Sequence, residues 1–72
     1  MDLKKALILL MKHTNLPVIG YWKKKDMYIF NVKAPRDDFT APAIFIVENS
    51  GNVYPSTNPM MYGISLKNMI KL

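Results

Sequence analysis

The spacing of hydrophobic residues predicts an amphipathic helix at the start of the chain. Asp2 precedes this stretch and can cap the helix N-terminus, while Pro17 prevents the helix from continuing. Ile8 and Leu9 lie off the main apolar stripe, so the apolar face is wider than one sheet contact needs. The residues that recur at the helical spacing i, i+3, i+4, i+7 are Leu3, Ala6, Leu7 and Leu10.

Two stretches rich in β-branched and aromatic residues predict a hairpin after the helix. They cover residues 17–23 and 27–34, and residues 24–26 form the turn between them. A loop over residues 34–42 follows. In the second strand Tyr28, Phe30 and Val32 share one face, and Met27, Ile29 and Asn31 share the other.

Residues 43–48 are apolar on both faces, which predicts a central strand covered on both sides. A tight turn at 49–51, with Gly51 at positive φ, leads to a short fourth strand that Pro55 stops at Tyr54.

The end of the chain is expected to be partly helical. Residues 56–59 are a polar loop, residues 60–62 a single helical turn, and Ser65 caps a last helical segment. In that segment Leu66, Met69 and Ile70 share a face. The expected fold is therefore one α+β domain over residues 1–72, with an N-terminal helix packed on a three- or four-stranded antiparallel β-meander and a short C-terminal helix.

Composition narrows how so small a domain is stabilised. The chain has 72 residues, no Cys and a single His, His13, so disulfides are excluded and a structural zinc site is nearly excluded. Good packing or oligomerisation remains. Several apolar positions exceed what one small core buries, which predicts a homodimer or a partner face. These positions are Ile8, Leu9, Met27, Ile29 and Ile46.

The charge and hydropathy of the chain limit which classes of partner it can have. No stretch could span a bilayer. The first residues faintly resemble a signal peptide, but the apolar run is too short and Lys12, His13 and Asn15 stand where a cleavage site should be, so we expect a soluble cytoplasmic protein with no membrane role. The net charge of +5 excludes an acidic DNA mimic and favours nucleic acid or acidic proteins as partners. A compositional bias toward lysine explains the charge equally well.

Catalytic chemistry has few candidate residues. His13 falls at a helix end, where it favours the helix dipole, and Asp37 and Asp38 diverge on an extended segment. The three glycines are far apart and form no phosphate loop. The sequence therefore predicts no catalytic, metal or cofactor-binding residues, no cofactor and no enzyme.

The most distinctive local feature is a run of lysines flanked by aromatics at the hairpin tip. It can hold a phosphate backbone while rings stack on bases, or present a hot spot to an acidic protein. It can also be a lysine-rich turn that keeps the hairpin from pairing edge to edge, with the aromatics in the core. The candidate partner-binding residues are Tyr21, Trp22, Lys23, Lys24, Lys25 and Tyr28.

Residues 42–54 read Pro-Ala-Ile-Phe-Ile-Val-Glu-Asn-Ser-Gly-Asn-Val-Tyr, two apolar strands around a glycine turn. With the preceding helix and hairpin, this resembles a diffuse group of small bacterial and phage proteins that includes immunity-like and peptidase-propeptide-like domains. The resemblance implies a helix on a β-meander and a protein that binds and inhibits another protein. It transfers no catalytic residue.

The sequence thus favours a non-catalytic protein-binding module, such as a phage or mobile-element accessory protein that inhibits or modulates a host or defence protein. The alternative is a nonspecific nucleic-acid-binding module that uses Lys23, Lys24 and Lys25 with Trp22.

Overall fold

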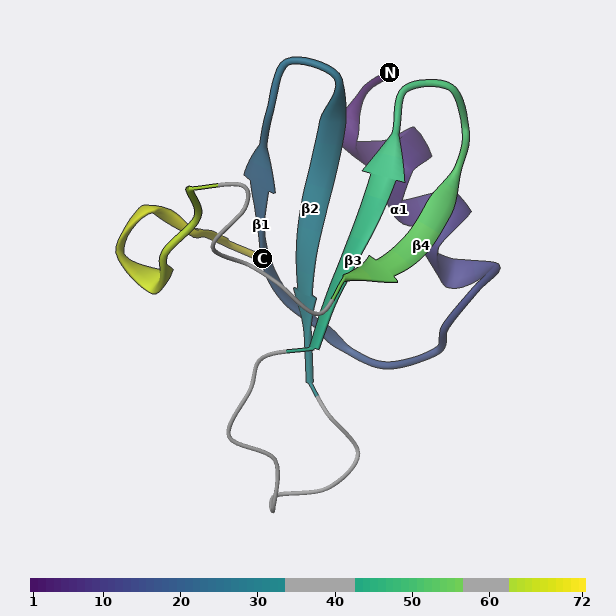
Figure 1. The fold of residues 1–72 in the computed structure, drawn as a ribbon. Helices are drawn as coiled ribbons and strands as arrows, with labels where there is room; N and C mark the ends of the chain where they lie inside the picture. Colours follow the sequence, from purple (N-terminus) through teal and green to yellow (C-terminus); the bar gives the residue numbers. More distant parts are fainter. Residues whose placement is uncertain (34–42, 57–62) are drawn as a thin grey trace.

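The computed structural model describes residues 1–33, 43–56 and 63–72, which form a helix and a five-stranded antiparallel sheet (Figure 1). The strand order is β4-β3-β2-β1-β5, so the first four strands form a meander and the last pairs with the outer edge of β1. The predicted α+β fold is confirmed. The elements are α1 (Leu3–Met11), β1 (Val18–Lys23), β2 (Met27–Val32), β3 (Ala43–Glu48), β4 (Val53–Ser56), the 3-10 turn η2 (Leu66–Asn68) and β5 (Ile70–Lys71).

Helix α1 begins and packs as its sequence predicts. The Asp2 side chain accepts a hydrogen bond from the backbone N–H of Lys5 at 2.8 Å, which caps the helix N-terminus. Ala6 and Leu10 are fully buried, and the helix packs against β3. Figure 1 shows α1 behind the β3–β4 side of the sheet, so the sheet face near β1 and β5 is not under the helix.

The hydrophobic core on the helix side forms because alternate strand residues face α1. Tyr28, Phe30 and Val32 of β2 point to this face, as their alternation predicts. Antiparallel pairing with β3 sets Phe30 opposite Phe45 and Tyr28 opposite Val47. The buried residues of this core are Ala6, Leu10, Tyr28, Phe30, Val32 and Val47.

A second apolar cluster lies on the opposite face of the sheet, and it corrects one expectation. Ile29 and Ile46 have no exposed surface within the single chain, and Met27 is partly buried against them. Leu9 is also partly buried, against the helix-side core, and only Ile8 of the five surplus positions is exposed. The sheet has an apolar core on each face, and the two cores together bury most of the side chains that were expected to be too many for one core. The cluster consists of Trp22, Ile29, Ile44 and Ile46, with Met27, Tyr54, Ile64 and Met69 packed against it.

The C-terminal segment (residues 63–72) contains no regular helix beyond one turn. Ser65 precedes the three-residue 3-10 turn η2, as expected of a helix cap, but the chain then becomes extended and forms β5. Met69 packs on the second cluster, whereas Leu66 and Ile70 are exposed, so the three do not share a buried face. Pairing of Ile70 with Tyr21 and of Lys71 with Gly20 explains the strand.

The turn after β3 has the predicted conformation, since Gly51 adopts φ +100°.

Pro55 lies inside β4 rather than ending it, and the strand extends to Ser56. The backbone of Glu48 bonds to that of Asn52, and in an antiparallel pair every second residue of a strand bonds to the neighbouring strand. Tyr54 and Ser56 therefore face β3, and the nitrogen of Pro55 faces away from it. An edge strand tolerates proline at such a position. The predictions for residues 34–42 and 57–62 lie outside the described residues.

Candidate functional site

The aromatic residues expected at the hairpin surface lie mainly in the interior. Tyr28 is 4% exposed and stacks on Phe30, with ring centroids 6.1 Å apart. Tyr21 is partly buried against the same two rings, at 6.0 and 6.2 Å. Trp22 points to the other face and is 5% exposed in the second cluster. These rings therefore fill the two cores, as the structural interpretation of the motif proposed.

The indole of Trp22 fixes the position of the C-terminal segment. Its Nε1–H donates to the Ser65 carbonyl oxygen and to Asn68 Oδ1, both at 2.9 Å. Asn68 Oδ1 also accepts from the backbone N–H of Ser65 at 3.0 Å. The turn η2 is thus held against Trp22, on the sheet face opposite α1, by bonds that span more than forty residues of sequence.

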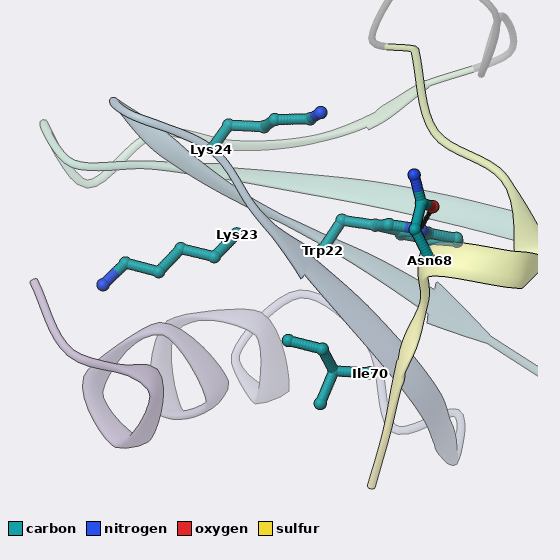
Figure 2. A pocket seen from close by; sticks show the side chains of 5 residues that line it. All are labelled: Trp22, Lys23, Lys24, Asn68 and Ile70. Carbon is teal, nitrogen blue, oxygen red and sulfur yellow. Dashed lines mark hydrogen bonds between the residues drawn. The ribbon is translucent and has the colours of Figure 1, made fainter.

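Two of the three lysines, Lys23 and Lys24, project from the end of β1 in different directions (Figure 2). Lys23 and Lys25 are exposed, and Lys24 is partly buried. The Lys23 ammonium lies 5.9 Å from the ring centroid of Tyr28, on the helix side. Figure 2 shows the Lys24 side chain extending away from that of Lys23. Lys23 and Lys24 therefore flank the sheet edge on its two faces instead of forming one flat patch (Figure 2).

An open depression of about 250 Å³ lies at this edge, between the hairpin and η2 (Figure 2). We call it the edge notch, and its lining residues are Trp22, Lys23, Lys24, Asn68 and Ile70. Its volume is below the roughly 300–1,000 Å³ of small-molecule sites. Its shape therefore suits part of a macromolecular partner better than an enclosed ligand.

Exposed apolar side chains continue from the edge notch along β1 and β5. The amide of Leu72 donates to the carbonyl oxygen of Ile19 at 3.2 Å, and Ile70 pairs with Tyr21. Ile70 and Leu72 lie two residues apart in an extended segment, so they point to the same side of the sheet. Ile19, Ile70 and Leu72 are 42%, 49% and 55% exposed, respectively. This apolar strip borders the lysines at one end.

Among the residues that the structure describes, the side chains with catalytic potential form no cluster. His13 Nδ1 lies 3.4 Å from the Leu9 carbonyl oxygen at the end of α1, the helix-end position that the sequence indicated. Asp37 and Asp38 lie outside the described residues. Within the described ranges no three His, Asp or Glu side chains gather where they could hold a metal ion. No helix among these residues has the length and apolarity needed to cross a membrane.

The sequence indicated the lysines of this site but not the residues on its opposite side. Asn68 and Ile70 come from a segment expected to be helical, about 45 residues after Trp22. The pairing that brings them to β1 is long-range, and no local pattern marks it.

Comparisons with known proteins identify no relative of the chain. No family model matches the chain, and searches of curated proteins and of solved structures return no similar protein.

Proposed function

We propose that this chain is a non-catalytic protein-binding module that contacts its partner through the edge notch and the adjoining apolar strip. The observation that carries the proposal is the juxtaposition of exposed Ile19, Ile70 and Leu72 with the lysines that line the notch. An apolar centre with a charged rim is the usual composition of a protein interface.

The charge of the edge favours an acidic partner surface. Lys23 and Lys24 line the notch, Lys71 belongs to β5, and Lys67 lies in η2. Long-range attraction raises the association rate of an oppositely charged protein, and the apolar strip then contributes affinity.

The burial of the rings supports a protein partner over the nucleic-acid alternative. Stacking on single-stranded bases needs exposed ring faces, and Trp22 and Tyr28 offer almost none. Trp22 also uses its N–H within the chain. Lysines alone supply phosphate attraction without base contacts.

The biological role proposed for this binding is inhibition or modulation of a host or defence protein in the cytoplasm by a phage or mobile-element accessory protein. The small size, the basic charge and the resemblance to immunity-like domains support it.

The test is a quantitative pulldown from host-cell lysate with the full chain and two charge-matched variants. The double variant Lys23→Glu/Lys24→Glu reverses the notch, and Lys4→Glu/Lys5→Glu makes the same charge change on the exposed side of α1. We expect a protein retained by wild type to be lost only from the first variant.

Equal retention by both variants would contradict the assignment of the site. Salt-sensitive binding of oligonucleotides that only the notch variant loses would favour the nucleic-acid alternative instead. Light scattering that shows a dimer of the wild type, disrupted by the same variant, would identify a second copy as the occupant.

A further inference from the structure

We infer that the partner contributes an extended acidic segment, one residue of which pairs its main chain with Lys23 in the edge notch. This inference rests on the proposed function, because it names the kind of segment that the notch accepts.

The pairing pattern leaves the backbone of Lys23 directed at the notch. The Lys24 amide donates to the Met27 carbonyl oxygen at 2.9 Å, so residue 24 faces β2. Neighbouring residues alternate, and the N–H and C=O of Lys23 therefore face the outer edge. Within the described ranges, β5 pairs only with Gly20 and Tyr21 and does not reach Lys23.

The chain segment just before β5 does not pair with Lys23, because it forms the turn η2 outside the sheet. The register that sets Ile70 opposite Tyr21 would set Asn68 opposite Lys23. Instead, Asn68 belongs to η2 and accepts a hydrogen bond from the Trp22 indole on the face opposite α1. Figure 2 shows Asn68 beside Trp22, and both residues line the edge notch together with the lysines. An added residue in this place would continue the row that β5 begins.

The lysines select the side chains of such a segment. A residue paired with Lys23 points to the same face as Lys23, where a carboxylate meets the ammonium as an opposite-charge cross-strand pair. The next residue toward the turn points to the other face, beside Lys24, while Met69 of this chain holds the place in line with Trp22. Carboxylates on two consecutive residues would meet Lys23 on one face and Lys24 on the other, and strand addition of this kind is an established mode of peptide recognition.

The first experiment is selection of a random peptide library displayed on phage against the immobilised full chain. We expect enriched peptides to carry two or more Asp or Glu residues and to lack internal proline. No enrichment, or enrichment of basic or purely apolar peptides, would overturn the inference.

The second experiment separates the backbone of Lys23 from its charge. Lys23→Ala and Lys23→Pro both remove the ammonium, but only the proline removes the N–H. That N–H faces away from β2, so the fold tolerates the change. We expect the best selected peptide to bind the proline variant about two- to tenfold more weakly than the alanine variant, the effect of one hydrogen bond.

A scan of single N-methyl groups along the same peptide gives an independent readout on the wild-type chain. It remains decisive if thermal unfolding shows that the proline variant does not fold. We expect a loss of binding at the one position that pairs with Lys23, and a uniform response would overturn the inference. If the notch charge variant loses the lysate partner while alanine and proline variants bind the peptide equally, the main-chain pairing is wrong and the proposed function stands.

Discussion

Gly20 in β1 is the position where the structure makes its sharpest energetic prediction. A Cβ atom placed on Gly20 would lie 2.7 Å from Met69 Sδ, 2.8 Å from Met69 Cγ and 2.8 Å from the Ile70 carbonyl oxygen. Carbon contacts are optimal at about 3.5–4.0 Å, so Gly20→Ala requires the C-terminal segment to move by several tenths of an ångström or more. Met69 cannot move without loss, because Asn31 Nδ2 donates to its sulfur at 3.6 Å and its side chain packs on the second cluster.

Two opposing effects set the magnitude. Overpacking of this kind costs about 1–3 kcal/mol, while replacing glycine restricts the unfolded chain and returns about 0.4–1 kcal/mol. The difference between these ranges is about 0–2.6 kcal/mol, and from its middle we expect Gly20→Ala to lower the free energy of unfolding by about 1–2 kcal/mol. For a domain of this size that corresponds to a fall in Tm of roughly 4–16 °C.

Thermal unfolding followed by circular dichroism measures the global effect, and tryptophan fluorescence measures the local one. Trp22 is the single tryptophan, and its indole bonds to the segment that must move, so we expect its emission to shift to the red in folded Gly20→Ala. Gly51→Ala is the matched control, because a Cβ there meets no atom within 4 Å but φ is +100°. It should destabilise the chain without altering Trp22 emission. A Gly20→Ala variant as stable as wild type, with unchanged emission, would refute the reasoning.

Further predictions concern the caps and cores. Trp22→Phe removes the indole donor from two acceptors, and we expect a loss of about 1–3 kcal/mol, measured by urea unfolding followed by circular dichroism. Asp2→Ala removes the acceptor for the Lys5 amide and should cost about 1 kcal/mol in the same assay, whereas a loss below the error would show that the cap contributes nothing. Ile46→Ala should cost about 2–5 kcal/mol, independently of protein concentration, because the side chain is buried within one chain. A concentration-dependent loss would instead place Ile46 in a subunit interface.

The sequence predicted the helix and the meander because their signals are local. The spacing of Leu3 to Leu10, the alternation around Phe30 and the glycine turn at Gly51 each depend on neighbours within a few residues. The C-terminal strand was not predicted, because Leu66, Met69 and Ile70 have helical spacing and only pairing with β1 makes them extended.

The candidate site was predicted in part for a related reason. The lysines at the hairpin tip were identified correctly as exposed or partly exposed, since a turn places them at the surface. The ring of Tyr28 belongs to the buried face that its alternation with Phe30 and Val32 already indicated. Trp22 was harder to place, because the segment that covers its face is distant in sequence.

Pro55 makes the two edges of the sheet chemically unequal. At the β4 edge, residue 55 is an outward-facing position without an N–H, whereas at the β1 edge the outward N–H of Lys23 faces the notch. A sheet that accepts strands at both edges can stack copy upon copy into a fibre. Here a strand that pairs with the β4 edge lacks the hydrogen bond that residue 55 would otherwise donate, so Pro55 makes this edge the weaker acceptor of a further copy.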